Sequence, residues 1–142
     1  MLKTMLKENI QISNSIENWE EAIHLASMPL LEKNNIQKKY VDAMIDGIKE
    51  LGPYIILIPG VAMPHSRPEN GVNDTSMALL KIEEGVSFSP TKEDVKLVFI
   101  LAAKDNSSHM DALVGLSDLL EDEKKVDAII RSVSVEEILN IL

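Results

Sequence analysis

Histidine is the side chain whose ordinary pKa lies closest to neutral pH, and this chain has three of them, at positions 24, 65 and 109. His65 stands in the segment GVAMPHSRPENG, residues 60–71, between Pro64 and Pro68. Each proline fixes its own φ and restricts the residue before it, so the pair stiffens the loop around the imidazole. A neutral imidazole keeps a lone pair on one ring nitrogen and can attack phosphorus or carbon. We therefore predict that His65 is a nucleophile presented by a rigid loop.

Two other roles are open to a functional histidine. A metal ligand needs two or more partner ligands, and a general base needs a nucleophile nearby. Neither accompanies His65 in the sequence, and the chain has no Gly-rich phosphate loop of the P-loop type. We expect no metal and no cofactor, and keep a hydrolase or metal protein built on His65 and His109 as an alternative.

His109 follows the polar stretch KDNSSH and precedes an apolar helical pattern, so it should lie near a helix N-terminus. Unpaired N–H groups and the helix dipole favour an anion there. We predict that His109 adds a hydrogen bond to phosphate oxygens. The alternative is a helix-start residue that faces solvent.

The remaining candidates are weaker. Arg67, two residues after His65, is either a phosphate clamp or a solvated loop charge. Lys49 closes a predicted helix, where a cation complements the C-terminal dipole, and phosphate binding is its second possible role. His24 is a helix-face residue to which we assign no function. The seven methionines are most simply core filler, and Met63, beside His65, could contribute to a docking surface if it is exposed.

Composition bounds the function. The chain has 142 residues, 45% of them hydrophobic and 26% charged, which favours a single domain over residues 1–142. The formal net charge of −9 argues against binding to a phosphate backbone, so no nucleic acid is expected, and it suits a basic protein partner. The absence of cysteine excludes disulfides and thiolate chemistry. No apolar run is long enough for a signal sequence or a membrane span, so we expect a cytoplasmic protein.

Two helices are predicted before the His65 loop. Asn18 can cap the first, with Glu21 completing a capping box, and Pro29 should break it. The second covers residues 36–51, where apolar side chains recur at three- and four-residue steps up to Gly52-Pro53.

Strands are predicted around the loop and after it. Residues 54–58 form an apolar run typical of a buried strand, and residues 76–82 form a second candidate. Residues 95–103 are apolar on both faces, which indicates a central strand, and a short strand could lie at 86–88.

Helices follow the strands. Ser107 or Ser108 could cap one that carries Met110 and a stripe of leucines, and Ser134 with Glu137 predicts a last short helix. The order of helices, strands and helices predicts an α/β fold, a three-layer sandwich with a mixed central β-sheet flanked by helices.

The segment PGVAMPHSRPENGV resembles the active-site segment of enzyme IIA in the bacterial phosphoenolpyruvate-dependent sugar phosphotransferase system (PTS), mannitol/fructose type, and in particular its ascorbate-like branch. The likeness extends over most of the chain, from NWEEAIHLASMPLLEKN through YVDAMIDGIKELGPYI to VKLVFILAAKDNSSHMDAL. This family folds as a mixed sheet sandwiched by helices, which agrees with the independent prediction.

The resemblance implies a phosphotransferase with a phosphohistidine intermediate. His65 would accept a phosphoryl group from the phosphocarrier protein HPr and pass it to a cysteine of the IIB component, and a membrane IIC permease would move the sugar. His109 matches the family's second histidine, beside the phosphorylated ring. Lys49 falls where the mannitol branch carries an arginine.

The expected sugar is ascorbate or a similar acidic sugar, and the alternative is a regulatory IIA-like module whose phosphorylation state controls a partner. Either role needs His65 in a shallow exposed site within an apolar docking surface.

Overall fold

The computed structural model describes residues 2–52, 54–88 and 94–142. In these residues one mixed sheet has the strand order β1-β4-β5-β3-β2. Its strands are β1 (Ile10–Ser13), β2 (Ile56–Ile58), β3 (Val61–Ala62), β4 (Ser76–Ser87) and β5 (Asp94–Ala102). The pairs β1–β4 and β3–β5 are parallel, whereas β4–β5 and β2–β3 are antiparallel. The predicted mixed sheet is confirmed.

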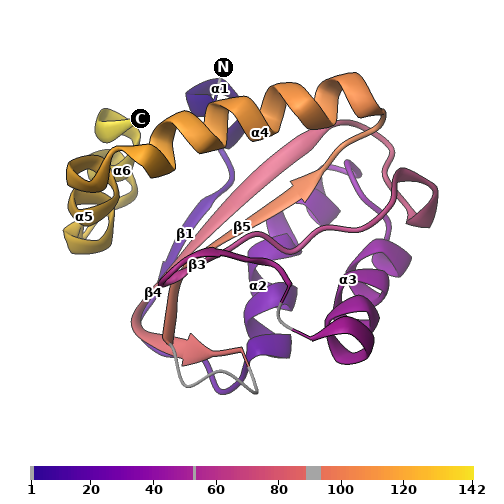
Figure 1. Ribbon diagram of the computed structural model, residues 1–142, viewed down its shortest axis with the longest axis horizontal. Coiled ribbons are helices and arrows are strands. Elements are labelled where there is room, and N and C mark those ends of the chain that lie inside the picture. Colours follow the sequence, from indigo (N-terminus) through magenta and orange to yellow (C-terminus); the bar gives the residue numbers. More distant parts are fainter. Residues whose placement is uncertain (1, 53, 89–93) are drawn as a thin grey trace.

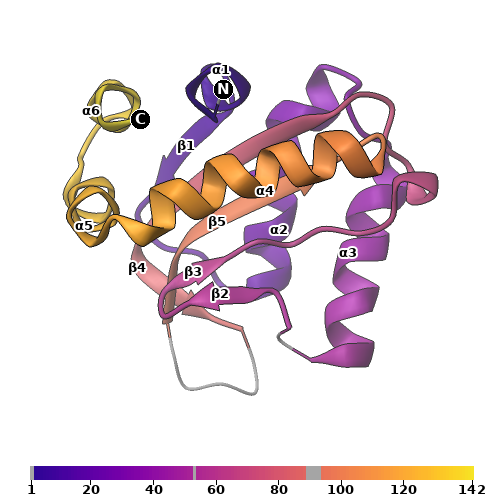
Figure 2. The same cartoon turned by 45° about the horizontal axis from the view of Figure 1, so that its top comes forward.

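Helices cover both faces of this sheet (Figures 1 and 2). Side chains of α2 (Trp19–Glu32) and α3 (Lys38–Leu51) share one hydrophobic cluster with the sheet. The opposite cluster contains side chains of α1 (Leu2–Leu6), α4 (Asn106–Glu121), α5 (Glu123–Arg131) and α6 (Val135–Ile141). The chain is therefore the three-layer α/β sandwich that the sequence predicts.

Strand β5 lies at the centre of the sheet, as its two apolar faces predict. Successive side chains of a strand point to opposite faces, so Val98 and Ile100 pack on the α2–α3 side whereas Leu97 and Phe99 pack beneath α4. All four are fully buried. Near the end of this strand, the Leu101 N–H donates to the Pro64 oxygen in the His65 loop.

The buried strand predicted at 54–58 is wrong in extent and in burial. Strand β2 covers Ile56–Ile58 at the sheet edge, and Leu57 is 40% exposed. Gly60, with φ +87, turns the chain back into β3, a two-residue strand that the sequence analysis missed. Because β3 lies between β2 and β5, strand β2 is at the edge of the sheet. The apolar run therefore has a strand neighbour on one side only.

Other boundaries also differ from the prediction. The predicted strand at 86–88 is the end of β4, which bends at Gly85 (φ +76) instead of stopping near residue 82. Helix α1 and strand β1 occupy the opening segment, and α5 follows α4 with Asp122 as its N-cap, and none of these was predicted. The Ser134 cap of α6 is confirmed, because its side chain accepts from the backbone N–H of Glu137.

The cap of α2 is as predicted, but its end is not. The Asn18 side chain accepts from the N–H of Glu21, yet the helix continues past Pro29 to Glu32. A proline inside a helix leaves the carbonyl four residues earlier, here that of Leu25, without its usual donor. Gln11 of β1 replaces that donor, since its Nε2 donates to the Leu25 oxygen over 2.7 Å.

Because Gln11 supplies the donor that Pro29 lacks, the effects of changes at Gln11 and Pro29 on the free energy of unfolding should be coupled. Gln11→Met should lower the free energy of unfolding by about 1–2 kcal/mol, because a partly buried carbonyl loses its donor. In a Pro29→Ala background the restored N–H can take over, so the same change should cost less than about 0.5 kcal/mol. Urea unfolding of the four proteins measures the coupling. An equal cost in both backgrounds would contradict the explanation.

Candidate functional site

His65 lies in the loop that follows β3, and its imidazole has one fixed nitrogen. Nδ1 is 2.8 Å from the backbone oxygen of Met63. Because a carbonyl oxygen only accepts, this contact requires the proton on Nδ1 and leaves the lone pair on Nε2. No residue of the described ranges makes a hydrogen bond to Nε2. The half-buried ring therefore has one anchored nitrogen and one unpaired nitrogen.

His109 stands in the first turn of α4, and the helix brings its ring beside His65. The two ring centroids are 5.9 Å apart at an interplanar angle of 53°. The cap of this helix is Asp105, not Ser107 or Ser108 as predicted. The Asp105 carboxylate accepts from the Ser108 backbone N–H, and the Ser108 hydroxyl completes the capping box. A carboxylate fits the role because it also complements the helix dipole.

The pKa values of Asp105 and His109, both at the start of α4, are lowered for different reasons. Hydrogen bonds from Ser108 hold the pKa of Asp105 below its ordinary value. Loss of solvent contact lowers the pKa of His109, and the charge of a protonated His65 lowers it further. His109 is therefore mostly neutral at pH 7, with one ring nitrogen able to donate.

Tyr54 is a neighbour of His65 that the sequence analysis did not identify. Its ring meets the His65 ring edge-on, with centroids 6.0 Å apart. A Cβ added at Gly47 of α3 would lie 3.2 Å from the Tyr54 hydroxyl, so the glycine makes room for it. In the sequence, Tyr54 is marked only by its type, an aromatic ring with a polar hydroxyl, at the start of the apolar run 54–58. His65 thus has two ring neighbours, Tyr54 and His109, with centroids 6.0 Å and 5.9 Å away.

An open cleft of ≈ 690 Å³ contains these three rings. Its walls come from the end of α3, the loop 65–70 and the start of α4. The lining residues are Ala43, Asp46, Gly47, Glu50, Leu51, Tyr54, His65, Ser66, Arg67, Pro68, Asn70, Asn106 and His109.

The two predicted cations are placed differently. Arg67 lines the cleft, although its side chain is 84% exposed and lies 4.0 Å from Glu69. Lys49 is not among the cleft residues, and its Nζ lies 3.7 Å from Glu20 of α2. The structure therefore brings His65, His109 and Arg67 together but turns Lys49 towards the neighbouring helix. Among the described residues no three His, Asp or Glu side chains are grouped to hold a metal ion.

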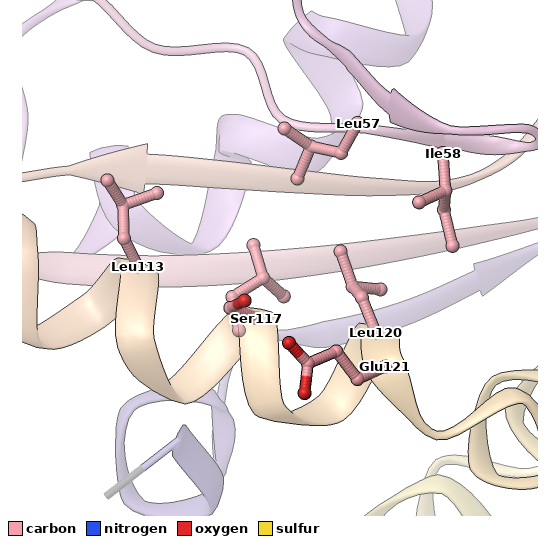
Figure 3. A pocket seen from close by; sticks show the side chains of 7 residues that line it. Leu57, Ile58, Leu113, Ser117, Leu120 and Glu121 are labelled. Atoms are coloured by element: carbon pink, nitrogen blue, oxygen red, sulfur yellow. The ribbon is translucent and has the colours of Figure 1, made fainter.

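Apolar surface extends from the cleft along α4. Figure 3 shows a second hollow, where Leu57 and Ile58 of β2 face Leu113 and Leu120 of α4. Leu113 is one helical turn beyond His109, so this hollow adjoins the cleft. Among the exposed apolar side chains, Leu51 and Tyr54 line the cleft and Leu57 lines the hollow, and Met110 and Val114 are exposed on α4. Met63 is 3% exposed and packs in the core beneath α4, so it is core filler and not part of a docking surface.

Comparison with solved structures places the fold. The solution structure of the mannitol-specific cryptic phosphotransferase enzyme IIA of Escherichia coli aligns with a TM-score of 0.93 at 38% identity, over 99% of this chain and 96% of that one. Enzyme IIA of mannitol from Escherichia coli, in a complex with phosphorylated enzyme IIB, aligns with a TM-score of 0.81 at 29% identity, over 94% and 93%. The fold and the histidine site define this chain as a IIA component of a sugar phosphotransferase system.

Sequence comparison gives the family. The chain belongs to the family described as phosphoenolpyruvate-dependent sugar phosphotransferase system, EIIA 2, whose model matches residues 3–142. The mannitol-specific cryptic enzyme IIA component of Escherichia coli (strain K12) is 39% identical over 96% of this chain and 92% of that protein. The ascorbate-specific EIIA component of the same strain is 30% identical over 99% and 94%. The family membership inferred from the His65 segment is confirmed, and the chain is similar to both branches.

Proposed function

We propose that this protein is a phosphohistidine carrier in which Nε2 of His65 accepts a phosphoryl group from HPr and passes it to a cysteine of a IIB component. The observation that carries the proposal is the Nδ1 contact with Met63, because it leaves the lone pair on Nε2 beside an open cleft. The transfer takes place in the cytoplasm and supplies sugar uptake by a membrane IIC permease. Among the described residues no helix is long and apolar enough to span a membrane.

The chemistry needs no base on this chain. The Nε2 lone pair forms the N–P bond while the donor's bond to phosphorus breaks, and Nδ1 keeps its proton throughout. The thiolate of the IIB component then attacks phosphorus, and the N–P pair returns to Nε2. Such transfers depend on positioning and on compensation of charge at three equatorial oxygens. His109, Arg67, Asn70 and Asn106 line the same cleft and supply the donors.

Partner docking follows from the surface around the cleft. A partner must bring its own reacting atom to Nε2, so the surroundings of His65 have to be accessible and partly apolar. The exposed apolar side chains at the end of α3, on β2 and on the first turns of α4 fit that need. The IIA relative solved with its phosphorylated IIB partner supports a IIB component as one occupant of this face.

Two classes of sugar are candidates for the transported substrate. The relative named for mannitol is 39% identical and the one named for ascorbate 30% identical, so the expected ascorbate is not favoured over a hexitol. Incubation with phosphoenolpyruvate, enzyme I and HPr should give one acid-labile phosphoryl group on the chain. IIB components of the mannitol and ascorbate kinds are then added in separate reactions. Transfer to one of them identifies the branch, and retention with both favours a regulatory module.

The pKa of His109 reports phosphorylation of its neighbour. In the free protein burial and the charge of His65 hold this pKa below the ordinary 6.5. A phosphoryl dianion on His65 reverses the sign of the second effect, so the pKa should rise by about one unit or more. Titration of the His109 ring protons by NMR, before and after phosphorylation, measures the change. A fall, or no change, would show that His109 does not face the phosphoryl group.

A further inference from the structure

The backbone on both sides of His65 is tied to the end of β5 at one residue, Leu101. The Leu101 N–H donates to the Pro64 oxygen over 3.2 Å. The Leu101 oxygen, which points to the same side of the strand, accepts from the Tyr40 hydroxyl over 2.7 Å. The same hydroxyl accepts from the Ser66 backbone N–H over 2.9 Å. Leu101 thus holds Pro64 directly and Ser66 through one phenol.

We propose that Tyr40 is a positioning residue for His65: its hydroxyl links Ser66 to the end of β5, and so fixes the loop at the residue after the imidazole. The proposal rests on the proposed function in so far as the loop must present Nε2 for transfer. With Pro64 and Ser66 both anchored, the backbone of His65 is held where Nδ1 contacts the Met63 oxygen. Tyr40 touches neither the phosphoryl group nor the ring, and it acts through the backbone.

The surroundings of Tyr40 are built to keep the phenol in place. Its side chain is fully buried among the core residues of the α2–α3 side. Gly71 follows the loop, and a Cβ there would lie 3.2 Å from the Tyr40 backbone nitrogen and 3.2 Å from its Cβ, so the loop closes tightly on α3. The Gly71 carbonyl accepts from Gln37, the residue that caps α3, over 2.9 Å. The phenol therefore has little freedom to follow a displaced loop.

The hydroxyl also has to keep its proton to bridge the two backbone groups. It donates that proton to the Leu101 oxygen and accepts from the Ser66 N–H on a lone pair. A phenolate has no proton to donate, and a phenyl ring can neither donate nor accept. Burial raises the pKa of Tyr40 to about 12, so the hydroxyl keeps its proton at neutral pH. A second tie holds the loop beyond it, where the Asn70 side chain donates to the Ser66 hydroxyl over 2.8 Å.

Tyr40→Phe tests the proposal, because it removes only the bridging oxygen. The expected result is a fall in the turnover rate of phosphoryl transfer from HPr of about tenfold, with the KM for HPr unchanged, since the docking face is untouched. In the wild type the His65 ring is fixed as the Nδ1–H tautomer. ¹⁵N spectra of Tyr40→Phe should show part of the His65 population as the Nε2–H tautomer. Ser134→Ala, which removes the cap of α6 on the far side of the sheet, is the control for a loss of stability alone.

The outcomes separate the two proposals. Wild-type turnover and an unchanged tautomer in Tyr40→Phe would overturn the positioning role, and so would equal rate losses in Tyr40→Phe and Ser134→Ala. A wild-type chain that takes up no phosphoryl group would overturn the proposed function, whereas the tautomer measurement would still test Tyr40. If Tyr40→Phe does not fold, amide exchange in the wild type decides: Ser66 should be protected well beyond Arg67, and equal exchange would overturn the bridge.

Discussion

Replacing His65 by alanine should abolish phosphorylation by phosphoenolpyruvate, enzyme I and HPr while leaving the fold intact. The change removes Nε2, the ring nitrogen whose lone pair the Nδ1 contact with Met63 leaves free beside the cleft. Its structural cost is small, because the ring is half-exposed and its one hydrogen bond is to its own loop. We expect the free energy of unfolding to change by less than about 1.5 kcal/mol. Radiolabel incorporation and urea unfolding measure the two effects.

His24 provides the matched control. It is an exposed residue on α2, and the cleft lining does not include it. His24→Ala should therefore take up the phosphoryl group at the wild-type rate. Phosphorylation that persists in His65→Ala but disappears in His24→Ala or His109→Ala would reassign the acceptor and contradict the proposed function.

Lys81→Ala should destabilise the protein more than any other single polar change discussed above. Lys81 lies in the middle of β4 with a side chain 1% exposed, and its ammonium contacts the Glu83 carboxylate and the Ser132 carbonyl. Alanine leaves a buried carbonyl without its donor and removes the packing of a four-carbon stem. We expect a loss of about 3 kcal/mol, at the low end for a buried pair because Glu83 can turn to solvent.

A second substitution separates charge from packing at this position. Lys81→Met keeps the stem volume and loses only the ammonium, so it should cost about 1–2 kcal/mol. Because Ser132 ends α5, amide exchange in residues 123–141 should increase in both variants. Urea midpoints give the energies. Equal losses for alanine and methionine would show that charge alone matters, and wild-type exchange in α5 would contradict the anchoring role.

The wrong predictions from sequence have a common physical cause. The apolar run at 54–58 predicts burial, but a strand becomes an edge strand only through the order in which strands pair, and β3 is too short to leave a pattern. Pro29 predicts a helix end, but Gln11 of another element supplies the missing donor. Each outcome depends on a partner distant in sequence.

The sequence by itself determined the family and the α/β layers, and it singled out His65 as the candidate nucleophile. Those features rest on local signals, namely hydrophobic periodicity, prolines around His65 and a characteristic loop segment. Only the tertiary structure decided which ring nitrogen of His65 is free, that the rings of Tyr54 and His109 lie beside it, that Lys49 turns away, and that the Tyr40 hydroxyl bonds Ser66. The contacts of His109, Lys49 and Tyr40 join residues tens of positions apart, and the contact of His65 with Met63 depends on the orientation of one side chain, so no local sequence pattern encodes them.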